Sequence, residues 1–110
     1  MEDNRDRRIN RRVNIDLWVE QQTTEGELYF QRAANFSSGG LYLDRTVPHK
    51  PGTRVKLSFQ LPGSKKTIKA VGEILDHHDS DGLGMGVKFV EIEEEDQISI
   101  EAWIDSVSAD

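Results

Sequence analysis

Two groups of side chains in this chain of 110 residues have the types and spacing to bind a ligand. The first is an arginine cluster near the N-terminus, where Arg8 and Arg12 lie four residues apart directly before an apolar stretch. A guanidinium offers a planar fork of donors that matches a phosphate or the Hoogsteen edge of guanine, and its face stacks on a purine. The cluster therefore favours a compact, flat anion as ligand, although a charge run is also the usual composition of a solvated tail.

The second group is the segment from Asn35 to Gly40, with the sequence Asn-Phe-Ser-Ser-Gly-Gly. Such a segment is typical of a hairpin turn, because Asn and Ser bond to their own backbone and Gly adopts positive φ. Two glycines and two serines also leave backbone groups bare, so that a flat polar ligand can approach closely. Both interpretations predict a turn at this position.

Catalytic chemistry has less support in the sequence. The chain has no cysteine, which excludes thiolate zinc sites and a cysteine nucleophile, and it contains neither a nucleophile elbow nor a phosphate-binding loop. His77 and His78 lie in an acidic run from Asp76 to Asp81, but the run lacks the ordered ligand spacing of a cation-binding loop. We expect a solvated hairpin loop there, with no metal site, no cofactor and no enzymatic activity.

Charge is segregated along the chain. Residues 1–12 contain five arginines against three acidic residues, whereas residues 91–110 contain eight acidic residues and no base, within a net charge of −6. A chain this acidic is a poor candidate for binding long nucleic acid. No apolar run approaches the roughly 20 residues that span a bilayer, and the N-terminus lacks the apolar core of a signal peptide. We expect a cytoplasmic domain without membrane insertion.

The elements that must position these groups follow from hydrophobic periodicity. Alternating apolar residues predict about six strands, over residues 13–20, 27–34, 41–43, 55–61, 67–75 and 85–90. Short turns between six strands indicate a small antiparallel barrel or a sandwich. Gly72 marks either a bulge or a close backbone approach in the fifth strand.

The C-terminal residues have a different period. Ile100, Trp103, Ile104 and Val107 repeat at helical spacing, which predicts a helix from about Glu94 to Val107 with Trp103 packed on the barrel. Trp18 falls on the polar side of the first strand, and the pattern leaves open whether it is exposed, covered by this helix or part of a partner surface.

The two candidate groups, in this order and with these elements, resemble the PilZ domain family. The family pattern R-x-x-x-R before the first strand is met by Arg8 to Arg12, and the later [D/N]-x-S-x-x-G is met by Asn35 to Gly40. Arg7 and Arg11 also fit the first pattern, but Arg12 adjoins the strand. The likeness spans about residues 5–105. It implies a six-stranded antiparallel β-barrel over residues 13–110, with a C-terminal helix, and a flexible arginine-rich arm over residues 1–12.

The resemblance also implies a ligand, the bacterial second messenger cyclic di-GMP. By the family pattern, Arg8 and Arg12 would contact guanine edges and phosphates, and Arg7 resembles the basic residue of members that bind an intercalated ligand dimer. The residues of the second motif complete the expected site: Asn35 and Ser37 as hydrogen-bonding groups, and Gly39 and Gly40 as points of close approach.

No output element is evident in the sequence, so we expect the signal to reach a protein partner in trans, in a pathway such as motility. The alternative is a PilZ-like adaptor that binds protein and no nucleotide.

Overall fold

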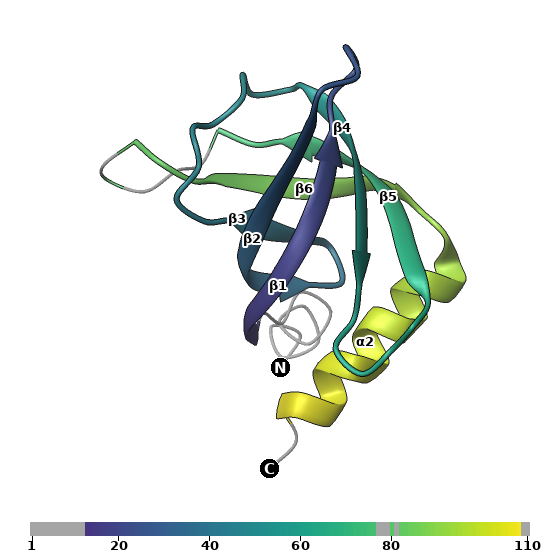
Figure 1. The fold of residues 1–110 in the computed structure, drawn as a ribbon. Helices are drawn as coiled ribbons and strands as arrows, with labels where there is room; N and C mark the ends of the chain where they lie inside the picture. The colour runs from purple at the N-terminus through teal and green to yellow at the C-terminus, as the bar shows by residue number, and fades with distance from the viewer. Residues whose placement is uncertain (1–12, 77–79, 81, 109–110) are drawn as a thin grey trace, which may run out of the picture.

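Six antiparallel strands close into a barrel in the spatial order β1–β2–β3–β6–β5–β4, and helix α2 follows the last strand (Figure 1). The computed structural model describes residues 13–76, 80 and 82–108. The expected six-stranded antiparallel barrel with a C-terminal helix is confirmed. The elements are β1 (Val13–Gln22), β2 (Leu28–Ser37), β3 (Gly40–Leu43), β4 (Arg54–Gln60), β5 (Thr67–Ile74), β6 (Met85–Ile92) and α2 (Glu94–Ser108).

The period-two patterns correctly predict which side chains fill the barrel. In β4 the apolar residues Val55, Leu57 and Phe59 are buried between exposed or half-buried neighbours. The same alternation buries Ile68 and Ala70 in β5. Successive side chains of a strand point to opposite faces, so this pattern fixes the register of the barrel wall.

Gly72 lies both at a β-bulge and at a close approach between strands, the two alternatives that the sequence offered. The register of β5 against β6 shifts between Val71 and Gly72, which is a β-bulge. A Cβ atom at Gly72 would also lie against the side chain of Val87 and 3.0 Å from that of Leu57. Glycine at this position therefore lets two barrel walls approach each other.

The predicted second strand over residues 27–34 is too short, and the predicted turn over residues 35–40 is too long. β2 continues through Asn35 and Phe36 to Ser37, because a register shift between Ala33 and Asn35 turns Phe36 into the core. The burial of an aromatic ring stabilises this extension more than the turn-forming tendency of Asn and Ser opposes it. Only Ser38 and Gly39 remain as the turn.

Aromatic rings join the helix to the barrel. Phe36 is fully buried, and its ring centroid lies 5.6 Å from that of Phe59 and 6.2 Å from that of Trp103. Phe59 stacks on Phe89 at 6.2 Å with an interplanar angle of 15°. Trp103 therefore packs on the barrel as predicted, and Ile100 and Ile104 are buried on the same helix face.

Trp18, by contrast, points away from the core. Its side chain is 64% exposed on the outer face of β1, whereas its neighbours Leu17 and Val19 are buried. Helix α2 therefore does not cover Trp18, which excludes one of the alternatives that the sequence left open.

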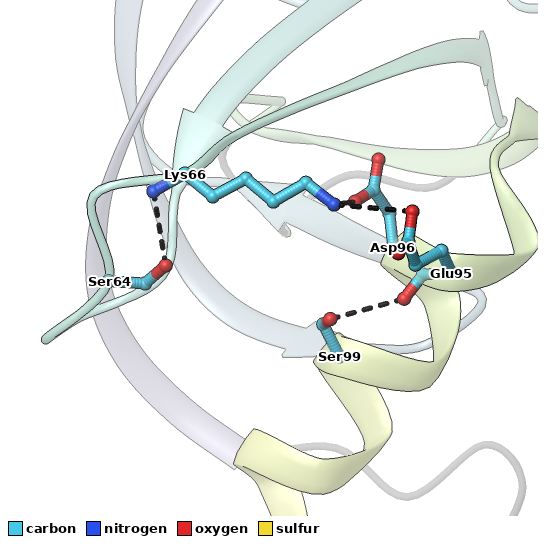
Figure 2. A network of polar contacts seen from close by, with 5 residues as sticks. All are labelled: Ser64, Lys66, Glu95, Asp96 and Ser99. Atoms are coloured by element: carbon cyan, nitrogen blue, oxygen red, sulfur yellow. Dashed lines mark hydrogen bonds and ion pairs between the residues drawn. The ribbon is translucent and has the colours of Figure 1, made fainter.

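The first turn of α2 is tied to the β4–β5 connection by Lys66 (Figure 2). The Lys66 ammonium lies 2.9 Å from a carboxylate oxygen of Asp96 and 3.7 Å from one of Glu95. Hydrogen bonding to Asp96 raises the pKa of Lys66 above its ordinary value. Acidic residues at a helix N-terminus are also stabilised by the helix dipole, so this contact fixes the start of α2.

Within the described residues, no helix has the length and apolar character required to cross a membrane.

Candidate ligand-binding site

The second motif forms the tight connection between β2 and β3. The Ser37 hydroxyl accepts a hydrogen bond from the Gly39 amide at 3.2 Å and donates to the Gly40 carbonyl at 3.4 Å. Ser37 and Ser38 are each only 3% exposed. The serine side chain therefore closes the turn on itself, as a hydroxyl commonly does in a short turn.

Two other elements hold this turn from outside. The Phe89 amide of β6 donates to the Gly39 carbonyl at 2.9 Å. The side-chain amide of Gln97, in the first half of α2, donates to the Ser38 carbonyl at 3.2 Å. Both carbonyls of the turn thus have protein partners, and the turn has one defined position on the barrel.

Gly40 has a reason to be glycine that lies within the fold. A Cβ atom there would collide with the carbonyl group of Val87, and it would lie 3.2 Å from the Lys88 Cα. The φ of Gly40 is not in the left-handed region, so conformational freedom is not the requirement. Close approach of β6 alone excludes a side chain at this position.

Asn35 lies two residues before Ser37 on β2, so the two side chains start from the same face of the strand, opposite to Phe36. Asn35 is half-buried and pairs with Asn14 of β1 on one side and with Tyr42 of β3 on the other. Register shifts adjoin it in both ladders. Bulges next to a site commonly re-aim a side chain, and here they accompany the change of face between Ala33 and Phe36.

The N-terminal end of β1 lies beside this turn. Val13 pairs with Phe36, and Asn14 pairs with Asn35. The described chain therefore enters the barrel one residue pair away from Ser37 (Figure 1). The expected first motif precedes this point directly in the sequence.

The arginines of the first motif, Arg7, Arg8 and Arg12, lie outside the described residues. His77, His78, Asp79 and Asp81 of the acidic run also lie outside them. Among the residues that the structure does describe, no group of three or more His, Asp or Glu side chains is placed to hold a metal ion.

Lys88 is a candidate site residue that the sequence patterns did not single out. It is the register partner of Gly40 across the β3–β6 ladder, and its side chain is exposed. No ion pair joins its ammonium to another residue of the described ranges. The sequence does show Lys88 as a polar residue between the apolar residues Val87 and Phe89, which predicts that its side chain is exposed. Strand alternation alone does not show that Lys88 pairs with Gly40.

Comparison with protein families matches the chain to one model. The PilZ domain model matches residues 6–106. A comparison with curated proteins finds no match.

Solved structures with this fold include three longer proteins. The Bacillus subtilis inhibitor of motility, MotI/DgrA, has a TM-score of 0.75 at 19% identity, over 87% of this chain and 48% of that one. The K. pneumoniae MrkH–c-di-GMP complex has a TM-score of 0.66 at 16% identity, over 89% of this chain and 51% of that one. The Borreliella burgdorferi PlzA protein in complex with c-di-GMP has a TM-score of 0.63 at 16% identity, over 93% of this chain and 43% of that one.

This chain thus spans about half the length of each of these proteins, and at such identities the likeness concerns the fold. The family model, in contrast, matches residues 6–106, a range that contains every strand of the barrel. The chain belongs to the PilZ domain family.

Proposed function

We propose that this chain is a receptor for cyclic di-GMP that passes the signal to a protein partner in trans, and that it is not an enzyme. The observation that carries the proposal is the position of the β2–β3 turn beside the start of β1. The first family motif directly precedes Val13 in the sequence, and Val13 pairs with Phe36 within the second motif, more than 20 residues later.

Chain length allows the arm to reach the turn. Arg12 is bonded to Val13, and an extended chain covers at most about 3.3–3.6 Å per residue. The Cα of Arg8 therefore lies within about 18 Å of the Val13 Cα, even before its long side chain is counted. This radius includes the whole β2–β3 turn, since Val13 pairs with Phe36.

The charge of the ligand selects the groups that bind it. Cyclic di-GMP carries two phosphates and two guanines, whereas the turn from Ser37 to Gly40 is uncharged. The guanidinium groups of Arg8 and Arg12 supply positive charge and the planar forks that match guanine and phosphate. Lys88, which faces Gly40 across the ladder, offers a further cation at the edge of the site.

The turn itself supplies polar groups in fixed positions. Asn35 offers an amide on the same strand face as Ser37, and the ties from Phe89 and Gln97 hold the turn in place. At 3.4 Å, the bond from the Ser37 hydroxyl to the Gly40 carbonyl is long for an O–H donor, so this proton is the one that the hydroxyl would redirect to a guanine acceptor. A preorganised turn loses little entropy when the ligand binds.

The N-terminal arm is also the segment that would transmit the signal. We propose that the ligand folds the arm across the end of the barrel and so creates or hides a surface for the partner. The ligand can shift this equilibrium only by its differential affinity for the two arm states. Amide hydrogen exchange across residues 5–12 tests this step: slower exchange with cyclic di-GMP is expected, and equal exchange with and without ligand would indicate a rigid site.

Single substitutions in the arm test the binding site. Arg8→Ala and Arg12→Ala are expected to lower the affinity for cyclic di-GMP at least about ten-fold, since a bidentate arginine–guanine pair contributes about 1–3 kcal/mol. Arg5→Ala is the matched control, because it removes the same charge from the same arm outside the motif. An equal loss of affinity in all three variants would mean that the arm attracts the ligand only through its overall positive charge.

Arg7 adds a prediction about stoichiometry. With Arg7 present, we propose that the site binds an intercalated dimer, so that two ligands bind per chain. A ratio of one would remove that part of the proposal while leaving the receptor assignment in place. Absence of any nucleotide binding would favour the alternative, an adaptor that binds protein alone.

A further inference from the structure

The first half of β2 has an open edge. Residues 28–31 pair with β1 on one side. On the other side β3 is shorter, and its pairing with β2 ends at the pair Leu43 and Ala33. One further hydrogen bond joins the Asp44 amide to the Arg32 carbonyl at 2.9 Å. Because the Arg32 carbonyl faces the β3 side, the peptide groups of Phe30, two residues earlier, face the same side. In the described ranges, no strand or loop pairs with Phe30 there.

The side chains along this edge are apolar and exposed. Phe30 is 70% exposed, Leu28 is 53% exposed, and Trp18, which stands opposite Arg32 on β1, is 64% exposed. Exposed strand edges promote unwanted pairing, and proteins usually protect them with lysine, proline or a bulge. Residues 28–31 include no lysine, proline or bulge. The loop after β3 contacts this edge at Gln31, through Thr46, and at Tyr29, through His49, but it leaves Phe30 exposed, which favours a binding role at that position.

A groove runs along the edge, and we call it the β2 groove. Its volume is about 530 Å³. Asp44 forms an ion pair with Arg32 at 2.8 Å and so anchors the turn that makes the far wall. The groove is lined by Trp18, Tyr29, Phe30, Gln31, Arg32, Asp44, Arg45 and Thr46.

Arg45 gives the groove its charge. It is exposed, and no ion pair joins it to any other residue in the described part of the chain. Its φ of 53° is the only positive value at a non-glycine residue in these ranges. Positive φ is uncommon at non-glycine residues, and such strained backbone conformations cluster at functional sites.

We propose that the β2 groove binds an extended segment of a partner protein, which pairs with the Phe30 backbone, packs an apolar side chain between Trp18 and Phe30, and places a carboxylate at Arg45. This is recognition by strand addition, in which backbone pairing supplies affinity and the pockets between side chains supply specificity. The inference deepens the proposed function by naming the surface that contacts the partner, and it rests on that function for the signal.

A second copy of this chain is the less suitable occupant. Trp18 and Phe30 together expose on the order of 300 Å² of accessible surface, whereas a stable association of folded proteins buries about 800 Å² on each partner. Each copy also carries a net charge of −6, so two copies repel each other. The N-terminal arm is excluded by its arginines, which would meet Arg45.

The test uses a random library of twelve-residue peptides, displayed on phage and selected on the full chain. We expect enriched peptides in which apolar residues alternate and at least one Asp or Glu is present. Binding should slow amide hydrogen exchange at Phe30, which gains an acceptor. Exchange at Gln31 should stay unchanged, because its amide faces β1.

Three variants and one control complete the test. Trp18→Ser, Phe30→Ser and Arg45→Gly should each weaken the selected peptides at least about ten-fold. Arg45→Gly keeps the fold, since glycine adopts positive φ freely. Val47→Ser is the matched control, because Val47 is an apolar residue 75% exposed outside the lining of the groove. Peptides that bind Trp18→Ser as tightly as the original chain, or that leave the exchange of Phe30 unchanged, would overturn the proposal.

Two further measurements separate this inference from its alternatives. Cyclic di-GMP should bind all four variants with unchanged affinity, so failure of nucleotide binding and failure of peptide binding are independent results. Sedimentation of the chain should show a monomer at every concentration used for selection. A dimer that Phe30→Ser dissociates would assign the groove to a second copy instead.

Discussion

Replacing Gly40 by alanine places a methyl group against the backbone of β6. The nearest atoms would be the carbonyl oxygen and carbon of Val87, the carbon at 3.1 Å, and the Cα of Lys88 at 3.2 Å. All three are backbone atoms in the β3–β6 ladder, so no side-chain rotation relieves the contact. The strands must separate, or the pairing of Gly40 with Lys88 must break.

The expected cost is near the upper end of the range for overpacking. Inserting a methyl group into a packed site costs about 1–3 kcal/mol, and rigid neighbours make about 3 kcal/mol the expected loss in free energy of unfolding. For a domain of this size, each kcal/mol lowers the melting temperature by about 4 °C, so Gly40→Ala should melt about 12 °C lower. Urea unfolding followed by tryptophan fluorescence measures the loss.

The matched control is Gly26→Asn, in the β1–β2 turn. No atom lies within 4 Å of a Cβ at Gly26, and asparagine tolerates positive φ, so a loss of about 1 kcal/mol or less is expected. If Gly40→Ala unfolded at the same urea concentration as the original chain, the close approach of β6 would not be what requires glycine there. Reduced cyclic di-GMP affinity in a fully folded Gly40→Ala chain would then indicate a direct ligand role.

Three further substitutions test other contacts. Ser37→Ala should lower the free energy of unfolding by about 1 kcal/mol, through loss of the turn-closing hydrogen bonds, as measured by urea unfolding; an unchanged midpoint would mean that water replaces the hydroxyl. Trp103→Ala should cost about 3 kcal/mol, because Trp103 packs on Phe36, and a loss below about 1 kcal/mol in the same assay would contradict that packing. Asp96 raises the pKa of Lys66, so their pairing should stabilise the fold fully at neutral pH and lose its effect as the pH rises through that raised value. Melting curves should therefore show the stability difference between the original chain and Lys66→Met disappearing at strongly alkaline pH, and a difference that stays constant would oppose this linkage.

Periodicity predicted the barrel wall because the barrel has one apolar face. In β4 and β5, residues such as Leu57 and Ile68 had to point inward in any packed arrangement of these strands. The helix was equally determined, since Ile100 and Ile104 repeat on one face with acidic residues before them. Such features depend only on local spacing, which a single sequence contains.

The end of β2 was less accessible to the same reasoning. Asn35, Ser37 and the glycines have the composition of a turn, and turn composition says nothing of a bulge that brings Phe36 into the core. The partners of the turn, Gln97 and Phe89, lie more than 45 residues away in the sequence. Contacts of this kind arise from barrel closure, which local patterns do not encode.

The β2 groove illustrates a third case. Trp18 and Phe30 could be identified from sequence as aromatic residues in strands, but the open backbone edge beside Phe30 follows from which strand ends first. β3 has only four residues, and its early end at Leu43 leaves the edge of β2 open. Relative strand lengths become visible only in the assembled sheet.

The central claim is that this PilZ chain binds cyclic di-GMP, and isothermal titration calorimetry of the unmodified chain tests it most directly. We expect saturable heat with a stoichiometry near two ligands per chain, and no heat from GMP at the same concentration. Absence of both heat and thermal stabilisation at high cyclic di-GMP would contradict the receptor assignment and favour the alternative, an adaptor that binds protein alone.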